Sequence, residues 1–175
     1  MDRKIVQRAD KVAFMEVENV FVRMKGFRSL DKNKTTKEFS RQYVDESFET
    51  TDTVGMSESI SYGFDQYTND KVHDKMVTIT DKELLGSDAT VTIVTVDFTK
   101  ELGAGTYEAK SRTYAVIPGA EGSGFEAYQY TGTFKNNGPN IEGKATSTDD
   151  WLTCTFTANA AAASGGGKAA TGGSK

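Results

Sequence analysis

The chain has 175 residues, of which 37% are hydrophobic, so it is long enough for one domain with a modest core. Its 25 acidic side chains outnumber 21 basic ones, and this net charge of −4 argues against ordinary binding to nucleic acid. A single cysteine, Cys154, and a single histidine, His73, exclude an internal disulfide and any metal site built from several His or Cys ligands, so we expect no metal, no cofactor and no enzymatic activity.

The first predicted element is a strand over residues 14–24, FMEVENVFVRM. Its side chains alternate loosely, and apolar groups stand on both faces, which predicts a strand that is covered on both sides. The same period of two, with threonines among aromatic and β-branched residues, recurs as far as residue 157. This pattern indicates an all-β domain over residues 1–157.

The next segment, residues 31–57, is too polar and too charged to build core. The sequence therefore predicts a long loop here. Its central piece, KEFSRQYVDESFE, contains Phe39, Tyr43 and Phe48, which are too many aromatic residues for a plain flexible connection. A loop of this length in a compact domain usually serves a function. A strand with clean alternation, ESISYGFD, is expected to follow over residues 58–65.

One segment, NDKVHDKMVTI, departs from the strand rhythm and predicts a short helix over residues 70–79. Three apolar residues with helical spacing are expected to pack this helix on the sheets: Val72, Met76 and Ile79. Either Asn69 or Asp70 is a suitable N-cap. His73 follows near the start of the helix, and we expect it at the surface or partly buried.

The second half of the chain returns to strands, which we expect over residues 89–98, 106–117, 125–135 and 151–157. The segment 89–98, ATVTIVTVDF, has the strongest strand pattern and is expected in the centre of a sheet, paired with 106–117 across a glycine turn. Residues 158–175 are Ala, Gly and Ser with little else, so we expect a disordered tail.

Two motifs suggest ligands, and both have simpler explanations. Asp149 and Asp150 beside Trp151 could bind a sugar, with Tyr128 and Tyr130 extending an aromatic platform, but a turn followed by a packing tryptophan is the favoured interpretation. Glycine-rich stretches such as GAEGSG lack the Lys-Ser/Thr pair of a phosphate loop and are expected to be hairpin turns. No apolar run is long enough to span a membrane, and no signal segment is evident, so we expect no membrane partner and synthesis in a cytoplasm.

Charge is distributed unevenly along the chain. Residues 1–41 carry 11 basic and 6 acidic groups (+5), whereas residues 42–88 carry 3 basic and 11 acidic groups (−8). Such blocks suit a head-to-tail contact between copies, because complementary potentials select that register. An unevenly charged, solvated surface explains the same counts without any partner, and on charge alone it is the favoured explanation.

Several segments resemble the major tail tube proteins of long-tailed bacteriophages, particularly those that infect Gram-positive hosts. The matching segments are YVDESFETTD (43–52), SISYGFDQYTNDKVHDKMVTITDKELLG (59–86), VDFTKE (96–101), TYAVIP (113–118) and KATSTDDWLTCTF (144–156). Together they span most of residues 10–157, and the tail from Ala158 lies outside the resemblance. These motifs are sequence signatures without any catalytic pattern.

The resemblance implies a two-sheet β-sandwich or barrel with one flanking helix, assembled into stacked hexameric rings. The rings would form the tail tube, through which DNA passes without specific binding when it is ejected into the host. It implies a protein located in the virion and assembled in the host cytoplasm. Its partners would be further copies of itself and the tape measure, tail terminator and baseplate hub proteins.

By the same resemblance, the long loop stacks one ring on the next. The residues that would make this contact are Phe39, Tyr43, Val44 and Phe48. The acidic residues that would face the lumen are Asp45, Glu46, Glu49 and Glu58. Two alternatives remain open: the tube of a phage-derived contractile bacteriocin or injection system, and, from a different class, a β-sandwich carbohydrate-binding module that uses Tyr128, Tyr130 and Trp151.

Overall fold

The computed structural model describes residues 3–160 of the chain. The elements in chain order are η1 (Arg8–Asp10), β1 (Lys11–Val17), β2 (Val20–Arg23), β3 (Phe27–Arg41), β4 (Thr50–Asp65), α1 (Lys71–Asp81), η2 (Gly86–Ala89), β5 (Thr90–Gly103), β6 (Thr106–Glu121), β7 (Gln129–Asn136), β8 (Ile141–Thr146) and β9 (Thr153–Ala158). The predicted disorder of the tail concerns residues that lie almost entirely outside the described range, so it stays a prediction.

The strands form one continuous hydrogen-bonded sheet that closes on itself. Their order is β3-β4-β7-β6-β5-β1-β2-β9-β8, and β8 also pairs with β6. This second pairing closes a six-stranded barrel from β6, β5, β1, β2, β9 and β8. The first half of β6 belongs to the barrel, with Tyr107–Ser111 paired to β8, and its second half pairs with β7. The predicted all-β sandwich or barrel with one flanking helix is confirmed.

Two apolar clusters form the core, and β5 contributes to both. Val91 and Ile93 belong to a cluster beneath α1, whereas Val94 and Val96 belong to a second cluster inside the barrel. Alternate residues of a strand point to opposite faces, so one strand supplies both layers. The sequence-based expectation that this segment is a central strand is therefore confirmed.

The predicted first strand, 14–24, is two strands joined by a tight turn. Glu18 and Asn19 both have positive φ values, 52° and 64°, which are the values that a two-residue hairpin of the I′ type requires. The chain therefore reverses after Val17 and pairs β1 with β2. The Asn at the second turn position is the local signal that strand alternation alone overlooks.

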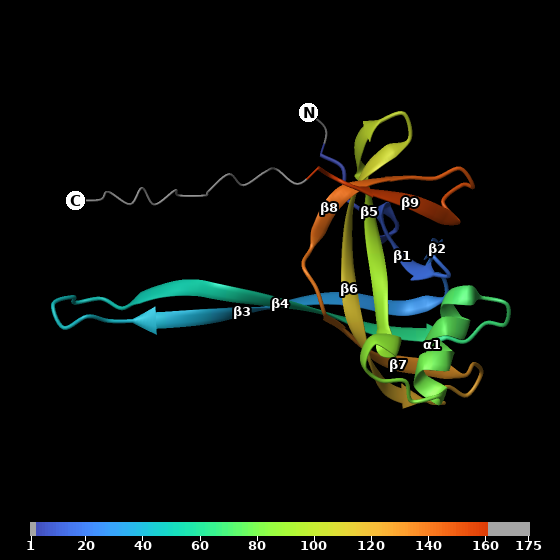
Figure 1. The fold of residues 1–175 in the computed structure, drawn as a ribbon, viewed down its shortest axis with the longest axis horizontal. Coiled ribbons are helices and arrows are strands. Elements are labelled where there is room, and N and C mark those ends of the chain that lie inside the picture. Colours follow the sequence, from blue (N-terminus) through green and yellow to red (C-terminus); the bar gives the residue numbers. More distant parts are fainter. Residues whose placement is uncertain (1–2, 161–175) are drawn as a thin grey trace, which may run out of the picture.

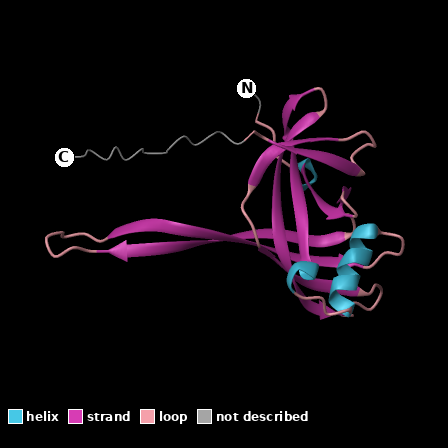
Figure 2. Cartoon of the chain, in the orientation of Figure 1, coloured by secondary structure: helices cyan, strands magenta, loops and turns pink. Residues whose placement is uncertain are grey.

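The helix α1 begins one residue later than predicted and ends at Asp81. The carboxylate of Asp70 accepts hydrogen bonds from the backbone N–H groups of Val72 and His73, so Asp70 is the N-cap. Val72, Met76 and Ile79 are at most 2% exposed and lie in the cluster beneath the helix. Figure 2 shows the helix at the end of the molecule away from the long hairpin.

His73 is fully buried, in contrast to the surface or half-buried position expected for it. Its Nδ1 accepts the backbone N–H of Tyr67 at 3.0 Å, which places the ring proton on Nε2, and Nε2 donates to the backbone oxygen of Lys25 at 2.9 Å. The ring also stacks on Phe64, with centroids 4.6 Å apart. Both nitrogens are satisfied, so burial of the neutral ring carries little penalty.

Replacing His73 with alanine is expected to lower the free energy of unfolding by about 3 kcal/mol, because it leaves two backbone groups unpaired and opens a cavity. Urea titration followed by circular dichroism measures this loss. Lys82→Ala, at the exposed end of the same helix, is the control and should change stability by less than about 0.5 kcal/mol. Equal stability of both variants would contradict the structural role of His73.

Most of the predicted long loop is an ordered hairpin. β3 and β4 pair in antiparallel register from Asp31 opposite Ser61 to Arg41 opposite Thr50, and only residues 42–49 form the connection. We call residues 31–58 the arm and residues 42–49 its tip. The arm projects far from the barrel (Figure 1). Neither of its faces is buried, so its strands carry no apolar alternation, and this explains why the sequence pattern indicated a loop.

Candidate assembly surface

The arm has free sheet edges on both sides. β4 pairs with β7 only over Ser59–Asp65, so the part of β4 from Thr50 to Glu58 has β3 as its one described neighbour. Along its other side, β3 has no strand neighbour within residues 3–160. The arm therefore presents two rows of backbone groups able to pair with another chain.

The side-chain contacts within the arm contribute little stability. Ser40 and Thr51 share a hydrogen bond of 2.8 Å, and Arg41 forms an ion pair of 3.1 Å with Asp52. Exposed pairs of this kind contribute about 0–1 kcal/mol each. A two-stranded hairpin without a buried face is marginally stable in water. A partner that covers the arm would therefore increase the stability of this hairpin considerably.

Large apolar side chains project from the arm into solvent. The predicted contact residues are all at least half exposed: Phe39, Tyr43, Val44 and Phe48. Phe39 lies on β3, and the other three lie in the tip. Val54 and Met56 on β4, which no sequence pattern singles out, are also more than half exposed. Several large apolar side chains gathered on one protruding element indicate an interaction surface.

The four predicted acidic residues do not lie together. Asp45, Glu46 and Glu49 are exposed in the tip, whereas Glu58 lies at the base of the arm with a side chain only 11% exposed. Its carboxylate accepts the hydroxyl hydrogen of Tyr114 and pairs with Arg112 at 3.5 Å. Burial, together with this hydrogen bond to a carboxylate, raises the pKa of Tyr114.

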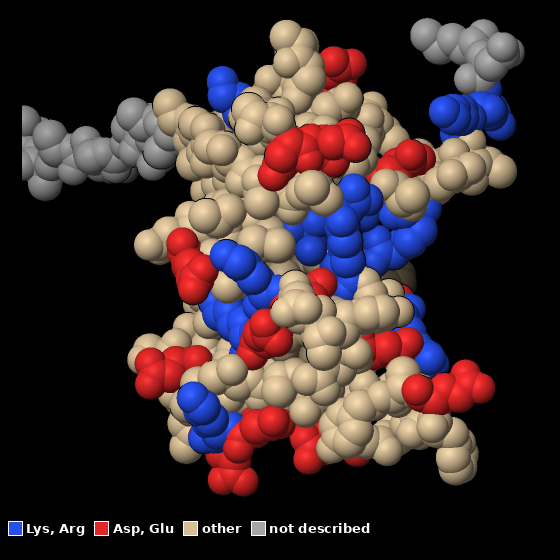
Figure 3. Space-filling model, turned by 90° about the vertical axis from the view of Figure 1, so that its right-hand side faces the viewer, with Lys and Arg blue, Asp and Glu red and all other residues tan. Residues whose placement is uncertain are grey.

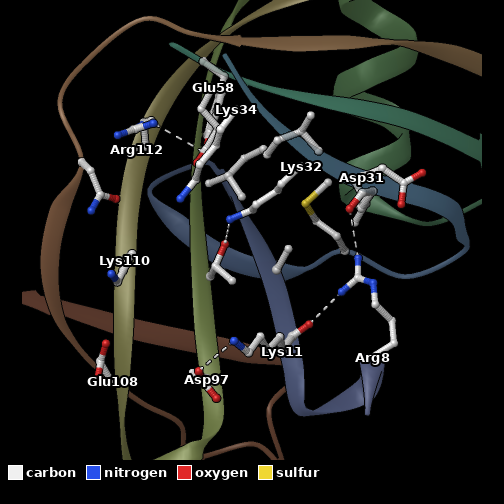
Figure 4. A pocket seen from close by; sticks show the side chains of 18 of the residues that line it. Arg8, Lys11, Asp31, Lys32, Lys34, Glu58, Asp97, Glu108, Lys110 and Arg112 are labelled. Atoms are coloured by element: carbon white, nitrogen blue, oxygen red, sulfur yellow. Dashed lines mark hydrogen bonds and ion pairs between the residues drawn. The ribbon is translucent and has the colours of Figure 1, made fainter. Parts of the chain in front are cut away.

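A cavity of about 640 Å³ opens between the base of the arm and strands β1, β5 and β6 (Figure 4). It is predominantly basic. Its cationic lining residues are Arg8, Lys11, Lys32, Lys34, Lys100, Lys110 and Arg112. Its acidic lining residues are Asp31, Glu58, Asp97 and Glu108. Seven cations against four carboxylates leave a formal charge of +3 around the cavity.

Some of the cations that line this cavity form ion pairs with carboxylates, and others do not. Lys11 pairs with Asp97 at 3.3 Å and Lys100 with Glu108 at 3.0 Å. Three others make no ion pair within the part of the chain that the structure describes: Arg8, Lys32 and Lys34. The side chain of Arg112 pairs through one terminal nitrogen, while its buried Nε has no hydrogen-bond partner among the described residues.

The ammonium group of Lys32 lies inside the cavity. Lys32 Nζ donates to the hydroxyl of Thr95 at 2.9 Å. Although much of the residue's surface is accessible, the cavity walls exclude water from the ammonium group, and this desolvation lowers the pKa of Lys32. The carboxylate of Glu58 raises the pKa, whereas neighbouring cations lower it further. An anion placed in the cavity would offset both the desolvation cost of this ammonium group and the repulsion from neighbouring cations.

Three further features of the described residues concern metal binding, thiol reactivity and membrane crossing. No group of three or more His, Cys, Asp and Glu side chains within residues 3–160 is placed to hold a metal. Burial raises the pKa of the Cys154 thiol to about 12, which disfavours the reactive thiolate. No described helix is long and apolar enough to cross a bilayer.

The aromatic platform expected for a carbohydrate module is not assembled. Tyr128 and Tyr130 lie together, with ring centroids 5.3 Å apart. Trp151 instead packs against Phe98 and Tyr107 in the barrel cluster, whereas Tyr130 belongs to the cluster beneath the helix. Trp151 and Tyr130 therefore belong to separate hydrophobic clusters, and Tyr128 is half exposed.

No protein-family model and no curated protein matches the chain. Several solved structures match the chain. A chain from the virion of a native gene transfer agent particle matches with a TM-score of 0.53 and 10% identity, over 88% of this chain and all (100%) of that one. A chain from the six-fold symmetrised baseplate of the anti-feeding prophage matches with a TM-score of 0.53 and 8% identity, over 81% and 97% of the two chains.

A chain from the tube-terminating cap of the anti-feeding prophage has a lower TM-score, 0.48, with 13% identity, over 84% of this chain and 95% of that one. At these identities the first two matches establish a shared fold. The fold is one found in virion and phage-derived particle proteins. The resemblance to tail proteins noted in the sequence is therefore supported at the level of the fold.

Proposed function

We propose that the protein is a structural component of a phage or phage-related tail, in which copies assemble into hexameric rings that stack into the tail tube. DNA would pass through the lumen of this tube during ejection. The observation that carries the proposal is the arm, an exposed hairpin with free edges and apolar side chains. The arm stands on a barrel fold that is also found in a gene transfer agent virion and in the baseplate of the anti-feeding prophage. A protruding element of this kind is marginal alone and gains stability in an assembly.

The arm is proposed to make the contact between successive rings. Phe39 on β3 and Tyr43, Val44 and Phe48 in the tip would supply its apolar area. A contact between the arm and a different surface of the next ring would be heterologous, and such a contact can repeat without limit when it does not close into a ring. Repetition of such a contact generates a stack of open length, as a tube requires.

The proposed role requires no catalysis, cofactor or membrane, and its partners would be further copies of the chain together with tape measure, terminator and baseplate hub proteins. The overall net charge of −4 would disfavour adhesion of the protein to DNA phosphates. In this role the protein would be located in the virion, after assembly in the host cytoplasm. A tube in a contractile bacteriocin or injection system is a variant that carries no genome.

Negative-stain microscopy and sedimentation velocity of the concentrated full-length protein test the proposal. We expect rings or tubes, and a sedimenting species far larger than the 19.0 kDa monomer. A tail tube can require a nucleating complex, so the experiment includes a high-concentration sample with an excluded-volume crowder. Monomers alone under every condition, especially with retention on glycan columns, would contradict the tube and favour a carbohydrate-binding module.

A further inference from the structure

The strongest unexplained feature of the molecule is the positive charge of the cavity at the base of the arm. Arg8, Lys32 and Lys34 have no carboxylate partner among the described residues, and the buried Nε of Arg112 has no acceptor. Buried N–H groups in native proteins nearly always have a partner. An anionic group that enters the cavity would complete both the charge balance and the hydrogen bonding.

The tip of the arm carries the matching charge. Residues 42–49, QYVDESFE, contain Asp45, Glu46 and Glu49 and no cation, for a formal charge of −3. All three residues are exposed, and none forms an ion pair within residues 3–160. The tip and the cavity thus carry formal charges of opposite sign, which favours specific recognition between the two surfaces.

The two surfaces cannot meet within one chain. Ten residue steps separate Asp31 at the cavity from Arg41 beside the tip, and a strand rises roughly 3.3 Å per residue, so the two ends lie about 33 Å apart. The pairing of β3 with β4 keeps the arm extended, as Figure 1 shows. A translation by about the length of the arm brings the tip of one copy to the base of the next.

We propose that the acidic tip of the arm binds in the basic cavity at the base of the arm of another copy of this chain. The proposal rests on the self-assembly described above and names the receptor of the arm. Tip carboxylates would pair with Lys34, Lys32 and Arg8 of the neighbour, and the exposed rings of the tip would cover the apolar lining at Met56. The assignment gives the tip acids a contact role in place of the lumen role expected from the sequence.

A second basic region is the main competitor for the tip. Figure 3 shows the side of the molecule away from the arm, where Lys and Arg side chains gather in the middle between acidic ones. A hollow between β2 and the start of α1 is lined by Arg23, Lys25 and Lys71. It is smaller, about 330 Å³, and its Lys71 already pairs with Glu18 at 3.3 Å. Its charge is therefore better compensated than that of the cavity.

Charge reversal tests the pairing. Glu46→Lys with Glu49→Lys changes the formal charge of the tip from −3 to +1. Lys32→Glu with Lys34→Glu changes the formal charge around the cavity from +3 to −1, at two residues without an ion pair among those described. We expect each change alone to raise the critical concentration for assembly at least about tenfold, and their combination in one chain to return it to within about threefold of the unmodified protein. An equal mixture of tip-reversed and cavity-reversed chains should assemble as well, because the two can alternate.

Two controls make the result specific. Lys25→Glu reverses an exposed charge in the competing hollow, and Glu126→Lys reverses an exposed charge outside the arm. Both should assemble normally, and thermal melts should show that every variant is folded. Loss of assembly with Lys25→Glu but not with the cavity-reversed variant would overturn the proposal in favour of the hollow beside α1.

A cross-link locates the contact directly and does not depend on tube growth. The one native cysteine is buried, so Glu46→Cys with Lys34→Cys adds the accessible thiols. Mild oxidation should produce a ladder of covalent oligomers, whereas Glu46→Cys with Lys25→Cys should give none. Assembly of the unmodified protein without cross-linking or charge dependence would overturn this proposal alone. Absence of both assembly and cross-linking would overturn the proposed function too.

Phosphate-rich nucleic acid is the other anion that could enter the cavity. Fluorescence anisotropy with a labelled single-stranded DNA of 20 nucleotides at physiological salt measures this directly. We expect no binding to the unmodified protein. Binding that is lost in the cavity-reversed variant would assign the cavity to phosphate and would overturn the assignment of the tip.

Discussion

Replacing both Phe39 and Tyr43 with alanine is expected to abolish tube growth and to leave the monomer folded. Both side chains are at least half exposed in the single chain, so their removal creates no internal cavity. At an interface, each lost aromatic anchor costs on the order of 2 kcal/mol, and the cost recurs at every subunit of a ring. Thermal unfolding of the monomer and electron microscopy of the same sample measure the two effects separately.

Leu85→Ala is the matched control for this double variant, because Leu85 is also largely exposed but lies outside the arm. It should form tubes like the unmodified protein. A double variant with an unfolded monomer would show that the two rings stabilise the fold, as would be expected for core residues at about 3–5 kcal/mol each. Normal tubes from the double variant would remove both residues from the ring contact.

Gly132→Ala is expected to destabilise the protein by about 3 kcal/mol or more, the largest effect on stability that we predict for a single added methyl group. Gly132 lies on β7 between β4 and β6, opposite Tyr62 and Pro118. A Cβ atom there would clash with the Tyr62 hydroxyl and with the backbone oxygen of Ile117. The hydroxyl end of a ring held in the core cannot move aside without disturbing the sheet.

Gly55→Ala on the arm is the control, because its added Cβ would meet only Lys37 Cβ at an ordinary 3.6 Å. Alanine should be neutral or slightly stabilising at that position, since it restricts the unfolded chain. Urea unfolding of both variants gives the comparison. Similar stabilities would mean that β4, β7 and β6 are less tightly packed around Gly132 than the structure shows.

The sequence predicted the parts of this fold that are buried on one face or on one stripe. The spacing of Val72, Met76 and Ile79 predicted α1 to within two residues at its end, and the alternation of residues 89–98 predicted the central strand β5. Such patterns exist because one side of each element meets the core. The hairpin turn at Glu18 and Asn19 was overlooked because backbone conformation, not burial, defines it.

The candidate site was only partly predictable for the same reason. The apolar residues of the arm stood out as aromatic rings in a polar segment, but strands exposed on both faces have no burial pattern to detect. The basic cavity joins residues as distant as Arg8, Lys34 and Arg112, which only the folded sheet brings together. Likewise, the burial of His73 depends on backbone groups of Lys25 and Tyr67 that no side-chain pattern reveals.

The way the arm joins the body determines how the protein would bear mechanical load. β4 runs without interruption from Thr50 in the arm to Asp65 in the body, where Ser59–Asp65 pairs with β7. A pull on the tip acts along these strands, and the hydrogen bonds between antiparallel strands lie across that direction. All bonds of the ladder then share the force in shear instead of opening one at a time. The attachment of the arm to the body would therefore resist tension far better than a strand pair whose hydrogen bonds break one after another from one end.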